Sequence, residues 1–205
     1  QDFHLTLQFL TTKTHIPKLS DRLVMRPRLL QTLNQCLLSG IQVVLVSAPA
    51  GFGKSTLLAQ WLHQVPAEFR VGWLSLDDTD SNLIRFFSYL MASLQPIIPG
   101  ISTKFAALAE LSSEITVEQC VAYFCDQVSD CEEQIILVLD DYQVITNPEV
   151  HLALKNLIDH LPENLHLVIA GRVEPPLPMA RLRASGKLKE VRTADLRFNQ
   201  AETNQ

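Results

Sequence analysis

The chain contains four short stretches that are apolar almost without interruption. These stretches are residues 42–47, 71–76, 134–141 and 165–170. They are rich in Val, Ile and Leu and do not alternate with polar residues, which is typical of strands covered on both faces. Apolar residues recur between them at helical spacing. The clearest helical stripe consists of Leu83, Phe86, Phe87, Leu90, Met91 and Leu94.

Strands that alternate with helices pair in parallel and are joined by right-handed crossovers. We therefore predict an α/β fold with three layers, in which a mainly parallel central sheet is flanked by helices. Local signals mark several helix starts. Thr116 with Gln119 forms a capping box, Asn147 caps a helix that begins with Pro148, and Asp80 or Ser81 is expected to cap the helix at residues 83–94.

Composition and charge narrow the class of protein. The chain has 205 residues, of which 47% are hydrophobic and 19% charged, as expected for a soluble domain with a full core. The net charge of −5 gives no basic field for a nucleic-acid backbone, so we expect no direct nucleic-acid binding by this part of the protein.

The cysteines and the apolar runs indicate the compartment. The four cysteines form no CxxC pair, and no histidines lie at zinc-finger spacing, so we interpret the cysteines as small buried hydrophobes in a reducing compartment. No apolar run reaches the length of about 20 residues that a membrane helix needs, and no signal-peptide pattern opens the chain. We predict a cytoplasmic protein without membrane contact.

The segment after the first predicted strand has the chemistry of a phosphate-binding loop. Residues 46–56 read VSAPAGFGKST and match the pattern GxxxxGK[ST], with Ala48 in place of the first glycine. Glycines allow backbone N–H groups to surround an anion, and a helix that begins there adds its dipole. The residues predicted to bind nucleotide are Ala50, Gly51, Phe52, Gly53, Lys54, Ser55 and Thr56.

Acidic and basic residues follow later predicted strands. Asp140 and Asp141 end the third strand, and Arg172 follows the fourth. We predict that Ser55 and Asp140 hold Mg²⁺ and that Asp141 orients or deprotonates the attacking water. Lys54 and Arg172 are the predicted catalytic cations. The alternative is that the two carboxylates only end a strand at the surface and the arginine is solvated.

Four segments carry a family resemblance: SAPAGFGKSTLLAQWL, GWLSLDDTDSN, LVLDDYQVITNP and LRASGKLKEVRTADLRF. Together they resemble the nucleotide-binding domain of the large ATP-binding LuxR-type, or MalT-like, transcriptional activators. These belong to the signal-transduction ATPases with numerous domains (STAND) and have a P-loop fold of the ASCE type. The resemblance implies that Arg26 lies against adenine and ribose.

The resemblance also implies a function. It implies an ATP/ADP switch in which ATP favours self-association of the full-length protein and slow, Mg²⁺-dependent hydrolysis resets it. It further implies sensor and DNA-binding domains outside this chain. The expected organisation is an extension or linker at 1–11, a nucleotide-binding domain at 12–198 and the start of a truncated helical segment at 199–205.

Two other functions remain open from the residues alone. One is a small-molecule kinase with the same loop, and the other is a non-catalytic scaffold that holds ADP. A kinase needs an arginine-bearing lid, for which a basic cluster is the candidate. We expect this cluster to be a solvated face or a surface that meets the next domain. Its members are Arg181, Arg183, Lys187, Lys189, Arg192 and Arg197.

Overall fold

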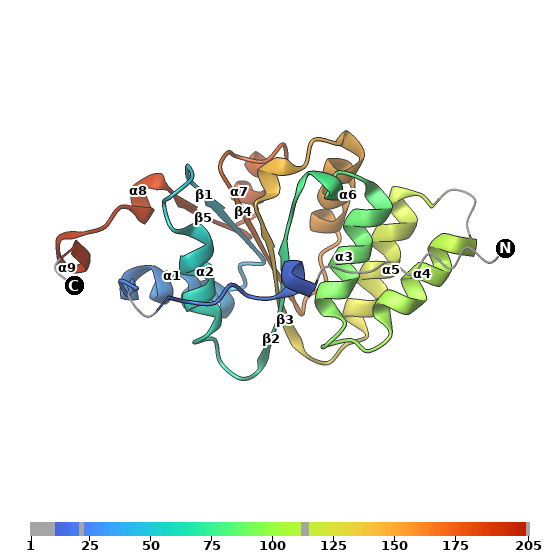
Figure 1. The fold of residues 1–205 in the computed structure, drawn as a ribbon, viewed down its shortest axis with the longest axis horizontal. Helices are drawn as coiled ribbons and strands as arrows, with labels where there is room; N and C mark the ends of the chain where they lie inside the picture. The colour runs from blue at the N-terminus through green and yellow to red at the C-terminus, as the bar shows by residue number, and fades with distance from the viewer. Residues whose placement is uncertain (1–10, 21–22, 112–114, 204–205) are drawn as a thin grey trace.

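The computed structural model describes residues 11–20, 23–111 and 115–203. Most of the predicted extension at 1–11 and the last two residues of the predicted helical segment lie outside these ranges. Figure 1 shows a sheet seen on edge between two groups of helices. The strands are β1 (Val43–Ser47), β2 (Phe69–Ser75), β3 (Gln134–Asp140), β4 (Leu165–Gly171) and β5 (Leu188–Arg192).

All strand pairs in the sheet are parallel, and the order is β2-β3-β4-β1-β5. The predicted α/β fold with a parallel central sheet is therefore confirmed. Strand β4 lies between β1 and β3, so the carboxyl ends of these three parallel strands lie side by side at one edge of the sheet. This edge is where an α/β sheet binds its ligands.

The helices form one layer on each face of the sheet (Figure 1). One layer contains α1 (Pro27–Leu38) and α2 (Lys54–Leu62), and the other contains α3 (Leu83–Leu94), α5 (Val117–Ser129) and α6 (Pro148–Asp159). Helix α4 (Ile101–Leu111) packs on α3. The short elements are η1 (Thr11–Thr14), η2 (Asp78–Asp80), η3 (Tyr142–Val144), α7 (Met179–Ala184), α8 (Thr193–Leu196) and α9 (Gln200–Thr203).

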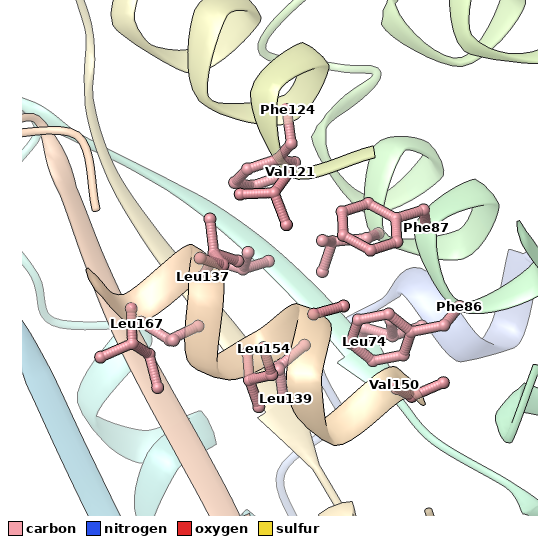
Figure 2. Packing of buried hydrophobic residues seen from close by; sticks show 14 of the residues in the cluster. Leu74, Phe86, Phe87, Val121, Phe124, Leu137, Leu139, Val150, Leu154 and Leu167 are labelled. Atoms are coloured by element: carbon pink, nitrogen blue, oxygen red, sulfur yellow. The ribbon is translucent and has the colours of Figure 1, made fainter. Parts of the chain in front are cut away.

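Each face of the sheet has its own hydrophobic core. The larger core joins the sheet to α3, α5 and α6, and Figure 2 shows its central residues, among them Phe87, Leu137 and Leu154. The other core joins the opposite face to α1 and α2. Leu45 belongs to the first core, whereas Val44 and Val46 belong to the second, because successive strand residues point to opposite faces. Burial on both faces explains the continuous apolar runs.

The helix caps test the local predictions. Thr116 and Gln119 form the predicted capping box, and Asn147 caps α6 as expected. The prediction that Asp80 or Ser81 caps α3 is wrong, because Asn82 accepts the capping bond from the Arg85 N–H. The Asp80 carboxylate is instead fully buried and paired with Lys13.

Strand β5 was not predicted from the sequence. It is a short edge strand in which only Val191 is buried, so its apolar pattern is weak. It lies in the basic cluster, whose Arg183 and Arg192 pair with Glu174 and Glu190 at N–O distances of 2.6–3.2 Å. No helix in the described ranges combines the length and the hydrophobicity needed to cross a membrane.

Candidate functional site

The loop from β1 to α2 has the backbone that a phosphate-binding loop requires. Gly51 and Gly53 have φ angles of +83° and +72°, in the left-handed region that favours glycine. A Cβ atom at either position would meet no atom within 4 Å, so backbone conformation rather than crowding requires glycine here. Gly53 is the N-cap of α2 and lacks a side-chain cap, so the positive end of the helix faces the loop.

Lys54 lies at the start of α2 and is 8% exposed. Its ammonium group donates to the carbonyl oxygens of Ala48 at 2.7 Å and Pro49 at 3.1 Å. Burial lowers the pKa of this lysine, and the negative charges of Asp140 and Asp141 oppose that shift. The cation is thus held over the loop by neutral acceptors.

Asp140 is the last residue of β3 and is 3% exposed. Burial raises the pKa of its carboxyl group, and a hydrogen bond with the Ser55 side chain opposes the rise. One carboxylate oxygen also accepts the N–H of Asp141 at 3.0 Å. A carboxylate beside a hydroxyl is a donor set that suits Mg²⁺.

This donor set is incomplete without a ligand. Within the described ranges, no group of three or more His, Cys, Asp or Glu residues is arranged to hold a metal ion. In nucleotide sites, Mg²⁺ takes one or two protein oxygens and obtains the remainder from phosphates and water. The pair Ser55 and Asp140 therefore fits Mg²⁺ that arrives with a nucleotide.

Gln143 connects Asp141 and Arg172, the other two residues predicted for this site. Its amide group donates to the Asp141 carboxylate at 2.9 Å, and its carbonyl oxygen accepts the N–H of Arg172 at 3.0 Å. Asp141 has a φ angle of 59° and is the only non-glycine residue of the described ranges with positive φ. Sequence reasoning missed Gln143, because its contact with Arg172 becomes visible only once β3 and β4 are known to be neighbours.

One cavity of about 370 Å³ brings most of these residues together. It is lined by Ala50, Gly51, Gly53, Lys54, Ser55, Thr56, Asp141 and Arg172. Asp140 is not part of the lining but bonds to Ser55. The loop and the ends of β3 and β4 thus form a polar cavity, although they lie far apart in the sequence.

A second cavity of about 550 Å³ shares Ala50, Gly51, Gly53 and Thr56 with the first. Its lining is mostly apolar and includes Phe52 and the predicted Arg26. Arg26 is 4% exposed, and its guanidinium donates to the carbonyl oxygens of Leu196 at 2.8 Å and Arg197 at 3.1 Å. Sequence reasoning did not identify the other lining residues outside the loop. They are Leu23, Val24, Leu57, Gln60, Leu196, Arg197 and Phe198.

Comparisons with known proteins identify the family and the fold of the chain. The family model described as an AAA ATPase domain matches residues 22–170. Over 182 residues the chain is 38% identical to the HTH-type transcriptional regulator MalT of Serratia proteamaculans (strain 568), a match that covers 89% of this chain and 20% of that protein. The chain therefore spans about a fifth of the length of this curated relative.

A solved structure shares the fold. Cdc6p from Pyrobaculum aerophilum superimposes with a TM-score of 0.55 at 19% sequence identity. The match covers 86% of this chain and 46% of the other. At this identity the likeness concerns the fold alone.

Proposed function

Because the chain belongs to the AAA ATPase domain family, we propose that it is the ATP/ADP-binding switch module of a signal-responsive transcriptional regulator. In this proposal, ATP favours self-association of the full-length protein and slow, Mg²⁺-dependent hydrolysis returns it to the resting state. The similarity to the transcriptional regulator MalT supports the regulatory setting. The sensor and DNA-binding parts of such a regulator are expected outside this chain.

The observation that carries the proposal is the pair of adjoining cavities. The polar cavity combines the loop amides with Lys54, Asp141 and Arg172. The larger cavity is mostly apolar and shares the loop. A nucleotide has the same division into a charged phosphate end and a largely apolar base, so one molecule can occupy both cavities.

The residues have distinct roles in this proposal. The amides of residues 50–56 surround the phosphates, and Lys54 exchanges its carbonyl acceptors for the outer phosphates. Ser55 and Asp140 would hold Mg²⁺, which neutralises charge on the phosphate oxygens when it is bound. Asp141 orients or deprotonates the attacking water, and Arg172 contacts the γ-phosphate.

The basic cluster offers little support for a kinase. Arg183 and Arg192 are paired with Glu174 and Glu190, and Arg181 lies 3.1 Å from Asp159. Arginines that are already paired are poor candidates for a mobile lid that closes on phosphates. This pairing favours the regulatory module over the kinase.

Thermal unfolding with Mg-ATP, with Mg-ADP and without nucleotide tests the proposal. A ligand present at 100 times its dissociation constant adds about 2.7 kcal/mol of stability. For a domain of this size, that gain raises the melting temperature by several degrees. The absence of any shift with either nucleotide would remove the proposed function.

Phosphate release then separates a slow ATPase from an ADP-holding scaffold. The regulatory ATPase predicts slow release that Asp141→Asn abolishes without loss of ATP binding. A wild-type chain that binds ATP but releases no phosphate would favour the scaffold.

A further inference from the structure

Arg26, directly before α1, contacts the segment from α8 to α9 next to the larger cavity. Beside its bonds to Leu196 and Arg197, its guanidinium lies 3.5 Å from a carboxylate oxygen of Glu202. It also lies over the ring of Phe198, 4.6 Å from the ring centroid. Arg26 thus contacts four residues between the end of α8 and α9, namely Leu196, Arg197, Phe198 and Glu202.

Glu202 is equally confined. It is 3% exposed, although it belongs to a short terminal helix. Its carboxylate accepts the N–H of Asn199 at 2.9 Å, and its own N–H donates to the Asn199 side chain at 2.8 Å. These reciprocal bonds fix the turn that begins α9 and present the carboxylate to Arg26.

Two segments that line the cavity are joined by Arg26, and Glu202 lies behind this junction, outside the lining. Val24 and Arg26 belong to one wall, and Leu196, Arg197 and Phe198 belong to the other. Arg26 Nε and Glu202 Oε1 are buried and have no hydrogen-bond partner. An unsatisfied buried polar atom costs free energy, so this contact is weaker than a fully bonded pair. A ligand placed between the walls can therefore change the strength of the contact between Arg26 and Glu202.

We propose that Glu202 is a positioning residue for the nucleotide pocket. It holds Arg26, and through Arg26 it keeps Leu196 to Phe198 in place as the second wall. The inference rests on the proposed function, in which the base of the nucleotide occupies this cavity. By linkage, a nucleotide that contacts this wall stabilises α9, and an undocked α9 weakens nucleotide binding by the same factor.

The test compares nucleotide affinities of the 205-residue chain by calorimetry. Glu202→Gln keeps the size of the side chain but removes its charge, and the exposed Glu68→Gln is the matched control. We expect Glu202→Gln to bind Mg-ADP and Mg-ATP about tenfold more weakly than wild type. Glu68→Gln should bind as wild type does.

The change in amide hydrogen exchange caused by nucleotide is a second measurement. A purely structural role of Glu202 would leave this nucleotide-dependent change the same in wild type and variant. Saturating Mg-ADP should slow amide exchange of residues 196–203 in the wild type and much less in Glu202→Gln. If wild type binds nucleotide but Glu202→Gln has an unchanged dissociation constant, the inference is wrong and the proposed function stands. A wild type that binds no nucleotide overturns both.

A second variant keeps the inference testable if Glu202→Gln does not fold. Phe198 is 58% exposed and lines the cavity, so Phe198→Ala removes part of the wall without opening a core. We expect about tenfold weaker Mg-ADP binding. Unchanged binding by Phe198→Ala would show that this wall does not contact the nucleotide and would overturn the inference.

Discussion

Two buried lysines lie near pairs of aspartates at the same edge of the sheet. Lys13 is 7% exposed and Lys54 is 8% exposed. Asp77 and Asp80 follow β2, while Asp140 and Asp141 lie at the end of β3, and these two strands are neighbours. Burial and acidic neighbours therefore do not distinguish the two lysines.

The pairing of their charges does distinguish them. The Lys13 ammonium pairs directly with Asp80 and lies 2.9 Å from Asp77, and the ring of Tyr89 covers it at 4.3 Å. Arg85 adds a second cation 3.5 Å from Asp80. We call these five residues the anchor, because they fix η1 against α3 and the end of β2.

Lys54 belongs to an open arrangement instead. Its acceptors are neutral carbonyls, and it lines a cavity together with Asp141 and Arg172. The anchor compensates its charges within the protein, whereas the loop keeps a cation and nearby carboxylates for a ligand. A buried lysine is thus a better functional candidate when its nearby carboxylates are not already paired with it.

Breaking the anchor should have the largest effect. Lys13→Met leaves the Asp80 carboxylate buried without its closest cation, so we expect the free energy of unfolding to fall by about 3–5 kcal/mol. Urea denaturation measures this loss. The double variant Lys13→Met, Asp80→Asn should recover part of it, because it removes the uncompensated charge. A loss below about 1 kcal/mol would contradict the structural role of the anchor.

Lys54→Ala should affect nucleotide binding rather than the stability of the unliganded chain, unlike the change at Lys13. We expect the unliganded chain to change in stability by less than about 1 kcal/mol, because removing the buried ammonium group relieves its burial cost and so offsets the loss of its hydrogen bonds and of its attraction to Asp140 and Asp141. The gain of about 2.7 kcal/mol from Mg-ATP at 100 times the wild-type dissociation constant should disappear. Urea denaturation with and without Mg-ATP measures both quantities. An equal nucleotide effect in wild type and Lys54→Ala would show that the two lysines do not differ in function.

A smaller effect is expected for Asp140→Asn. Burial penalises the charged form of Asp140, and an asparagine oxygen can still accept the Asp141 N–H. We expect about 1 kcal/mol of added stability at pH 7, together with weaker Mg-ATP binding, as is common when a functional group is replaced. Asp80→Asn, its counterpart in the anchor, should lower the stability. If both variants shift the urea midpoint in the same direction, the distinction between the two sites fails.

The sequence predicts the parts of this comparison that depend on local pattern. Buried strands β1, β3 and β4 appear as continuous apolar runs, and the glycines and Lys54 follow β1 within a few residues. Parallel pairing then places Asp140, Asp141 and Arg172 at the edge where Lys54 lies. This reasoning needs only that strand ends meet at one edge.

Contacts between distant segments could not be predicted in this way. Lys13 meets Asp80, and Arg26 meets Glu202, only after the sheet has brought those segments together. Neither pair has a local spacing rule. Gln143 likewise reaches Arg172 because β4 lies beside β3, and β5 was missed because an edge strand buries little apolar surface.

The smallest expected effect is the contribution of Asp77 to the stability of the fold at acid pH. Burial opposes ionisation of Asp77, but hydrogen bonds from Thr79 and Lys13 lower its pKa from 3.8 to about 2. A carboxyl group with a depressed folded-state pKa adds stability above its unfolded value, and this contribution is lost as the pH falls towards 2. Because the side chain is 48% exposed, solvent screening limits the contribution to less than about 1 kcal/mol.

Asp77→Asn should therefore flatten the dependence of stability on pH between 4 and 2, relative to wild type. Urea midpoints measured at pH 5, 4, 3 and 2 give this slope, and the exposed neighbour Asp78→Asn is the control. Parallel curves for wild type and Asp77→Asn would mean that neither Thr79 nor Lys13 favours the ionised form of Asp77. The anchor would then be held by Asp80 alone, and the contrast with Asp140, whose pKa is raised, would rest on one carboxylate instead of two.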